Sequence, residues 1–142
     1  MELSLSSAHA SKLVWLDEVG STNTYLVAAV NSEEAHNWPD FSVVATDNQV
    51  AGKGRLGRDW SAPAGASLAV SVLLRPETPA GRPLPPESLG WFGLLAGLAM
   101  TRACNQVFPE GKKASIKWPN DVLIEGKKVC GILSELVMTP PG

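Results

Sequence analysis

The sequence predicts an α+β domain in which helices flank a mixed sheet. Several short runs are rich in valine, isoleucine and leucine, which is typical of strands. Two longer segments, one after residue 23 and one after residue 88, have the spacing or the composition of helices. The elements follow one another as strand, helix, strand, loop, strand, helix and hairpin. This order differs from the strict alternation of a parallel α/β fold.

The chain is expected to begin with a loose tail over residues 1–13, and the domain then extends over residues 14–142. A strand is predicted over Val14–Val19, before a turn at Gly20–Asn23. The next segment is predicted to be a helix, because apolar residues recur at positions 25, 26, 29 and 30. This helix ends before a turn cluster at 37–40.

Two further strands complete the first half. Phe41–Thr46 contains adjacent valines, which favour extended backbone. Asn48–Pro63 is predicted to be a long glycine-rich loop, and Ser67–Leu74 to be a strand again.

The second half opens on residues 75–88, where five prolines prevent regular structure. Ser88 is expected to cap a helix that runs to about Phe108 and is buried on most sides. Gly93 and Gly97 would let another element approach this helix closely.

A strand over Ser115–Trp118 is expected to end at Pro119. Val122–Ile124 and Lys128–Val137 then form two strands joined around a Glu-Gly-Lys turn, which is a hairpin signal.

Composition excludes several classes of protein. An apolar content of 44% is enough for a core and excludes a disordered chain. The net charge of −2 argues against a basic nucleic-acid binder. The N-terminus lacks the apolar run of a signal peptide, and the longest apolar stretch, Leu89 to Thr101, is too short to span a bilayer. Cys104 and Cys130 form no metal-ligand motif and are expected to be reduced thiols. We therefore expect a cytoplasmic protein with no nucleic-acid or membrane partner.

The basic residues are concentrated in two short segments. Eight of the 12 lysines and arginines lie within 53–58 and 112–128. If the segments meet in space they form an anion site. The alternative is a pair of solvated basic loops.

The most conspicuous motif is Gly-Lys-Gly-Arg-Leu-Gly at 52–57, which matches GxGxxG. A dinucleotide-binding fold needs a helix directly after it, and residues 58–63 are a poor helix start. A kinase needs a lysine in the next strand, which is missing. A flexible loop remains, in which Arg55 and Arg58 can bind phosphate or carboxylate oxygens. Trp60 either stacks on a flat ring or anchors the core.

Three other segments carry polar groups suited to a ligand. Ser21, Thr22 and Asn23 offer donors and acceptors, or they form a plain helix cap. Asn120 and Asp121 follow Pro119, where an amide can read a purine edge and a carboxylate can hold Mg²⁺, or where both only close a turn. Lys128 starts a strand and can project into a site, or it belongs to a solvated lysine pair.

Taken together, the four segments resemble one family, the bacterial biotin protein ligases, which share a catalytic domain with lipoate ligases. The matching motifs are GSTN at 20–23, QVAGKGRLGRDW at 49–60, KWPND at 117–121 and GKKVCGILSE at 126–135. Their combination favours biotin over lipoate. The resemblance implies a class II synthetase-like catalytic domain as the fold.

The resemblance implies a two-step reaction. Biotin and ATP, with Mg²⁺, give biotinyl-5′-AMP and pyrophosphate. The biotinyl group then passes to one lysine of a biotin carboxyl carrier protein, such as the carrier domain of acetyl-CoA carboxylase or a related carboxylase. Biotin's carboxylate is already ionised at neutral pH, so the first step needs positioning and cations rather than a base. The resemblance leaves a homodimer open.

Site residues follow from the resemblance, motif by motif. Ser21, Thr22 and Asn23 bind the biotin head, with Gln49 beside them. Lys53, Gly54 and Arg55 belong to the loop that closes over biotin and the adenylate, and Arg55 retains the adenylate. The nucleotide and its metal are served by Arg58, Trp60, Asn120 and Asp121, of which Asp121 is the Mg²⁺ ligand.

Lys128 reaches the biotin carboxylate and the phosphate, and it is expected to be the main catalytic residue. Lys117 shares a motif with the nucleotide-binding residues but is expected to be structural.

Two departures from the family pattern lead to expectations of their own. Only about a dozen residues precede Val14, so we expect no winged-helix DNA-binding domain and no repressor function. The chain ends soon after Val137, so we expect the N-terminal part of the catalytic domain, without a further strand and a small C-terminal barrel. Such a sheet would expose an edge.

Two other functions stay open at this stage. One is a truncated, non-catalytic fragment that binds biotin or the carrier, which pyrophosphate release would distinguish. The other is a different nucleotide-binding enzyme that uses the loop at 52–58. Protection of the fold by biotin, but not by lipoate, would argue against this second function.

Overall fold

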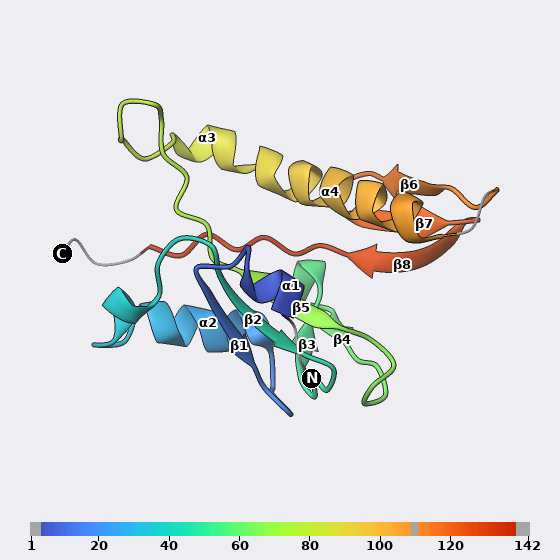
Figure 1. The fold of residues 1–142 in the computed structure, drawn as a ribbon, viewed down its shortest axis with the longest axis horizontal. Helices are drawn as coiled ribbons and strands as arrows, with labels where there is room; N and C mark the ends of the chain where they lie inside the picture. Colours follow the sequence, from blue (N-terminus) through green and yellow to red (C-terminus); the bar gives the residue numbers. More distant parts are fainter. Residues whose placement is uncertain (1–3, 109–110, 139–142) are drawn as a thin grey trace. The chain divides into compact units, whose positions relative to one another are not determined.

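The computed structural model describes residues 4–108 and 111–138. The chain divides into two compact units, the first made of Met1–Pro76 with Val137–Gly142 and the second of Glu77–Leu136. Each unit contains strands and helices, so the predicted combination of sheet and flanking helices is confirmed (Figure 1).

The first unit is built on a three-stranded mixed sheet in the order β1-β2-β5. Strands β1 and β2 are parallel, whereas β2 and β5 are antiparallel. The elements of this sheet and its helices are α1 (Ser4–Ser7), β1 (Lys12–Trp15), α2 (Thr22–Val30), η1 (Ala35–Asn37), β2 (Ser42–Thr46) and β5 (Ala69–Val72).

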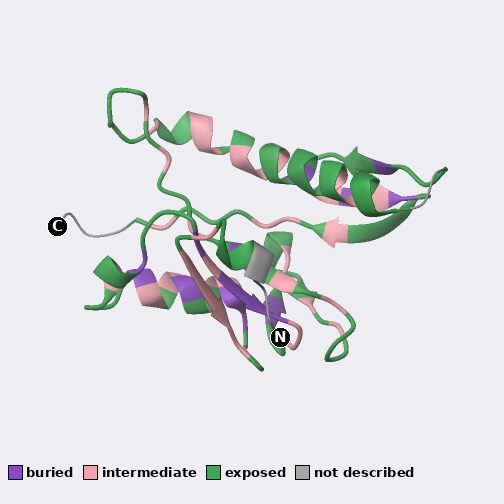
Figure 2. Ribbon diagram, viewed as in Figure 1, coloured by how far each residue is buried: buried purple, intermediate pink, exposed green. Residues whose placement is uncertain are grey.

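Helix α2 packs on this sheet and supplies half of the unit's core. Leu26 and Val30 of α2 lie against Val44 of β2 and against Trp38, and all four are buried. Figure 2 shows the buried residues concentrated in α2 and β2. Of the four apolar positions that predict this helix, Leu26 and Val30 form the buried face, Ala29 is partly buried and Tyr25 is exposed.

The long loop predicted over Asn48–Pro63 contains short regular elements. Strands β3 (Gly52–Lys53) and β4 (Asp59–Trp60) pair antiparallel, with the 3₁₀ turn η2 (Arg55–Gly57) between them. This correction to the sequence prediction has a physical reason: two-residue strands are too short to show any alternation of apolar residues.

The described part of the second unit contains two helices and a three-stranded antiparallel sheet in the order β6-β7-β8. Its core is Ala114, Val122 and Ile124, against which Cys104 and Cys130 pack. The elements are α3 (Pro86–Leu89), α4 (Trp91–Val107), β6 (Ala114–Lys117), β7 (Asp121–Ile124) and β8 (Lys127–Gly131).

The predicted hairpin is confirmed, and its turn explains the sequence signal. Glu125 and Gly126 both have positive φ angles, of 49° and 77°. Such a turn matches the twist of the flanking strands and favours glycine. Both cysteines are free thiols, as the sequence predicts.

Element boundaries differ from the prediction in several places. A short helix, α1, lies in the segment expected to be a loose tail, and β1 begins at Lys12 rather than Val14. Strand β8 ends at Gly131, well before Val137. Helix α4 is capped by Gly90, and Ser88 lies inside α3.

The expectation that α4 is buried on most sides is wrong. Gly97 is its one buried residue, whereas Trp91 is 65% exposed and Leu95 55% exposed. Ile132 packs beside Gly97, but a Cβ at this position would still make an ordinary contact of 3.5 Å, so the approach does not require glycine. No helix within residues 4–108 and 111–138 is long and apolar enough to cross a membrane.

Candidate functional site

In the first unit, the Gly-Ser-Thr-Asn segment forms the start of helix α2. Ser21 is the N-cap, with extended backbone, and its hydroxyl accepts a hydrogen bond of 3.4 Å from the Thr24 N–H. The capping prediction is therefore confirmed. Ser21 and Thr22 are only 6% and 4% exposed, so their polar groups face the interior of the unit.

Gln49 lies beside this helix start. The backbone N–H and the hydroxyl of Thr22 both donate to Gln49 Oε1, at 2.9 and 3.2 Å. A parallel bridge between Val19 and Gln49 holds the two segments together. Residues 27 positions apart in sequence thus form one polar cluster.

Ser71 completes the cluster, and it was not among the site residues predicted from the sequence. Its hydroxyl lies 2.8 Å from Thr22 Oγ1 and is also hydrogen-bonded to Asn23 Oδ1. The signal in the sequence that could have indicated this residue was a serine within a run of apolar residues. Ser71 pairs in register with Val44, whose side chain belongs to the core under α2. A polar side chain on that face needs a partner.

The β3–β4 hairpin packs closely beside Gln49 because Gly52 has no side chain. A Cβ at this position would lie 2.4 Å from Gln49 Nε2 and 2.6 Å from the Trp60 carbonyl oxygen. Trp60 also contacts Gly52 through its ring and is half-buried, which favours an anchoring role for this tryptophan.

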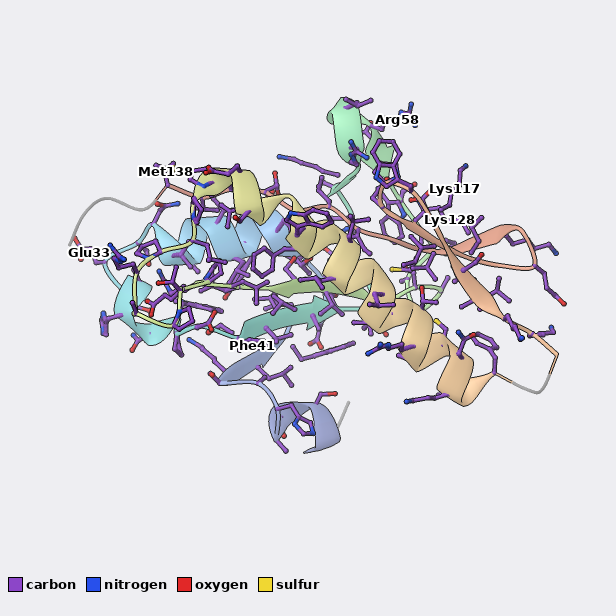
Figure 3. The ribbon with its side chains drawn as sticks, turned by 90° about the horizontal axis from the view of Figure 1, so that it is seen from above. Glu33, Phe41, Arg58, Lys117, Lys128 and Met138 are labelled. Atoms are coloured by element: carbon purple, nitrogen blue, oxygen red, sulfur yellow. The ribbon has the colours of Figure 1, made fainter. Side chains whose placement is uncertain are left out.

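The cationic side chains of the same loop are exposed. Lys53, Arg55 and Arg58 all lie on its outer part, and Figure 3 shows Arg58 extending from it. Leu56, at the tip, has a φ of 60° and is 87% exposed. The loop therefore places charge and one apolar side chain in solvent, where a ligand can reach them.

In the second unit, Lys128 and Asp121 form an ion pair. Lys128 Nζ lies 2.7 Å from Asp121 Oδ1, and the two side chains are 47% and 20% exposed. The oxygen is buried and has no partner with hydrogen-bond geometry, so the contact is mainly electrostatic.

The ammonium of Lys128 occupies the space above Gly131. A Cβ on Gly131 would lie 2.9 Å from Lys128 Nζ and 3.0 Å from Cε. The glycine inside this strand thus makes room for the lysine.

Asn120 and Lys117 lie at the turn between β6 and β7, and their described contacts involve the backbone of this unit. The Asn120 side chain donates to the Ile132 carbonyl at 3.0 Å, and the Ile132 N–H donates back to Asn120 O at 2.8 Å. These bonds hold the turn to the segment that follows β8. Lys117 pairs in register with Asp121 at the end of β6 and is exposed.

The geometry gives no support to the expected Mg²⁺ ligation by Asp121. A protein-held Mg²⁺ needs free oxygen ligands in octahedral geometry. The carboxylate of Asp121 is already engaged by an ammonium. Across residues 4–108 and 111–138, no three His, Cys, Asp or Glu side chains gather in a way that could hold a metal ion. Within the described residues no carboxylate cluster is preformed for Mg²⁺, and its ligation by Asp121 stays a prediction.

Cys130 follows the lysine pair in β8 and has a perturbed thiol. Burial raises its pKa above the ordinary value, and the charges of Cys104 and Asp121 act in the same direction. The ammonium of Lys128 opposes them. A partly buried thiol with a raised pKa carries little thiolate at neutral pH, which argues against a nucleophilic role for Cys130.

Comparisons with known proteins agree on one family. The sequence model of the biotin/lipoate A/B protein ligase family matches residues 15–140. The bifunctional ligase/repressor BirA of Bacillus subtilis is 34% identical over 124 residues, which cover 87% of this chain and 34% of that protein. A biotin–[acetyl-CoA-carboxylase] ligase of Mycobacterium tuberculosis is 37% identical over 120 residues, covering 84% of this chain and 42% of the relative.

Solved structures agree with the sequence comparisons. The biotin protein ligase of Aquifex aeolicus, solved with biotin and ATP, superposes with a TM-score of 0.66 and 32% identity. The match covers 89% of this chain and 47% of the other. The chain thus spans less than half the length of each of the three proteins compared here.

Proposed function

Because the chain belongs to the biotin/lipoate A/B protein ligase family, we propose that it supplies the biotin-binding and phosphate-binding groups of a biotin protein ligase. The reaction is the activation of biotin by ATP to biotinyl-5′-AMP, followed by transfer of biotin to a lysine of a carrier protein. The observation that supports this most strongly is the cluster formed by Thr22, Asn23 and Gln49 at the start of α2.

In the first step, the carboxylate of biotin attacks the α-phosphorus of ATP and pyrophosphate leaves. No protein nucleophile is needed, so the protein contributes orientation and positive charge. Ser21, Thr22, Asn23 and Gln49 bind the polar head of biotin in this proposal. Neutral hydrogen-bonding groups in a buried setting suit an uncharged, polar ring.

Lys128 supplies the charge for this step. Its ammonium is paired with Asp121 and about half exposed, so it is positioned and still open to solvent on one side. Negative charge that builds on the α-phosphate and on the leaving pyrophosphate is stabilised by such a cation. Arg55 and Arg58, exposed on the loop, bind phosphate or carboxylate oxygens of the adenylate. Mg²⁺ belongs to the substrate here and arrives with ATP.

In the second step, the ε-amine of the carrier lysine attacks the acyl carbon of biotinyl-AMP and AMP leaves. The carrier in this proposal is the biotin carboxyl carrier domain of acetyl-CoA carboxylase or of a related carboxylase. The relative in Mycobacterium tuberculosis bears the name of that acceptor enzyme, which supports this choice.

Transfer of biotin to a carrier domain tests the proposal. The chain is incubated with biotin, MgATP and a biotin carboxyl carrier domain, and the labelled domain is detected by its mass. We expect one added biotinyl group, on one lysine. A lipoyl domain supplied with lipoate is the matched control and should stay unmodified. Labelling of the lipoyl domain instead of the carrier, or of neither, would contradict the proposal.

A further inference from the structure

Ser71 is a buried polar residue without an assigned role. It is 5% exposed and lies in β5, paired with Val44 across the sheet. Its hydroxyl contacts Thr22 Oγ1 at 2.8 Å and is hydrogen-bonded to Asn23 Oδ1. It therefore connects two side chains of the proposed biotin site without belonging to helix α2 itself.

The number of available protons limits how this cluster is bonded. Thr22 and Ser71 bring one hydroxyl proton each, whereas the amide oxygens of Gln49 and Asn23 only accept. Three oxygen–oxygen contacts link the four groups, namely Thr22–Gln49, Ser71–Thr22 and Ser71–Asn23. The two hydroxyl protons can therefore form only two of these three hydrogen bonds at a time. In every arrangement the Ser71 proton goes to Thr22 or to Asn23.

In the arrangement in which Ser71 donates to Asn23 and Thr22 donates to Gln49, these bonds fix the direction of two amides. The oxygen and nitrogen of an amide lie on opposite sides of one carbon, so an Asn23 whose Oδ1 accepts from Ser71 turns its NH₂ group away from Ser71. Gln49 behaves in the same way, because Thr22 holds its Oε1. Its NH₂ group then lies over Gly52, at the position where a Cβ would be only 2.4 Å away.

We propose that Ser71 is a positioning residue for biotin binding, which acts by holding the Asn23 amide and the Thr22 hydroxyl in one orientation. This inference rests on the proposed function. With the amide oxygens held inside the cluster, the NH₂ groups of Asn23 and Gln49 are directed as donors. Such a pair suits a ligand that offers an acceptor, as the ureido carbonyl of biotin does.

Ser71→Ala tests the proposal, with Ser42→Ala as the matched control. Ser42 is also a buried serine of the same sheet, but its hydroxyl donates to the Pro39 carbonyl at 2.7 Å and takes no part in the cluster. Biotin affinity is measured by calorimetry on the full chain, at a temperature where thermal melts show all variants folded. We expect Ser71→Ala to bind biotin about tenfold more weakly, the effect of losing one buried hydrogen bond. Ser42→Ala should stay within about twofold, although it loses a hydrogen bond of the same kind.

A double-mutant cycle separates positioning from general stability. In an Asn23→Ala background, Ser71→Ala should cost less than about threefold in affinity, because residues in one network are not additive. A merely structural serine would cost the same in both backgrounds.

The outcomes distinguish this inference from the function on which it rests. Wild-type protein that binds biotin, with Ser71→Ala equal to Ser42→Ala or with additive losses in the cycle, overturns the role of Ser71 alone. Wild-type protein that fails to bind biotin overturns the proposed function and this inference with it.

Discussion

Lys128 owes its position to two neighbours, Asp121 and Gly131. Asp121 attracts the ammonium from the adjacent strand, at 2.7 Å, and Gly131 leaves the space into which the side chain folds. Neighbouring Lys127 lies in the same turn and strand, yet no comparable contact surrounds it among the interactions described. The two lysines are therefore distinguished by local geometry rather than by sequence.

Replacing Lys128 tests this distinction. If its ammonium stabilises charge on the α-phosphate, Lys128→Ala should slow biotin-dependent pyrophosphate release by about 10²–10³, the usual effect of losing one preorganised donor. Lys127→Ala is the matched control, because it removes the same charge one residue earlier. Equal rates for the two variants would show that Lys128 has no special role.

Gly131→Ala tests the space beside the ammonium. The added Cβ would lie 2.9 Å from Nζ, so the flexible end of Lys128 must move away from Asp121. We expect pyrophosphate release to fall by about tenfold, less than for loss of the lysine, because a misplaced cation retains part of its effect. Gly126→Ala would not be a suitable control, since Gly126 has a positive φ of 77°. A Gly131→Ala rate equal to that of the wild type would contradict this account of the lysine's position.

The free energy of unfolding is predicted to depend on pH through the thiol of Cys130. Burial, then the charges of Cys104 and Asp121, raise the pKa of this thiol, and Lys128 opposes them. The folded chain therefore keeps the thiol proton to higher pH than the unfolded chain does. As the pH rises through the ordinary thiol range, about 8.5, the unfolded state loses its proton first and the free energy of unfolding falls.

The rate at which Cys130 is alkylated measures the same shift of its pKa. Iodoacetamide labelling of Cys130, followed by peptide mass spectrometry, should be slower in the folded chain than in urea at pH 8. Its rate should rise with pH along a curve displaced to higher pH than that of the unfolded chain. Coinciding curves would mean that the thiol is not perturbed by its surroundings.

At the scale of elements, the β3–β4 hairpin is the part of the chain best suited to change on ligand binding. Its strands have two residues each, and its tip carries exposed Leu56 with a positive φ. Few buried contacts and exposed backbone hydrogen bonds are typical of segments that open locally. Gly52 packs closely against Gln49, and the Ala51 N–H donates to the Gly20 carbonyl at 2.7 Å, so the base of the hairpin is held to the cluster while its tip is exposed.

Limited proteolysis tests the mobility of the hairpin. Trypsin should cut first after Lys53, Arg55 or Arg58 in the ligand-free chain, since all three are exposed on this loop. Biotin with a non-hydrolysable ATP analogue should protect these sites. Cutting after Lys112 and Lys113, which are also exposed and have no role in the proposed site, is the internal control and should change little. Equal cutting of the loop with and without ligands would contradict this role.

The elements also show how far sequence reasoning reaches. Helix α2 and the turn at Glu125-Gly126 were predictable, because a local signal decides each of them: apolar spacing in the helix and positive φ in the turn. The start of β1 was not, because Lys12 joins the strand through partners distant in sequence. It pairs with Ser42, and its ammonium lies 3.8 Å from the centre of the Trp38 ring.

The same limit applies to the candidate site. The residues of the four motifs could be selected from the sequence, since their chemistry is visible in the residue types. Ser71 could not, because a serine in a strand gains meaning only from the strand register that places it opposite Val44 and beside Thr22. The pairing of Asp121 with Lys128, seven residues later, likewise depends on the hairpin register between β7 and β8.

At the scale of the whole molecule, the two units contribute different chemistry. The first holds neutral donors and acceptors in a buried cluster, together with an exposed cationic loop. The second holds an ion pair on a small antiparallel sheet. Groups of the first kind suit an uncharged polar ring, and a cation of the second kind can stabilise phosphate charge. The chain spans 34% and 42% of the two curated relatives compared here, so the activity of this chain itself is the point to measure.

Pyrophosphate release from ATP tests whether this chain activates biotin, because it reports that step without requiring a carrier protein. The chain is mixed with MgATP and either biotin, lipoate or no acid, and pyrophosphate is followed by a coupled assay. We expect pyrophosphate release to depend on biotin, and lipoate to give no more release than the background without acid. Release that is absent with biotin, independent of it, or equally strong with lipoate would contradict the account.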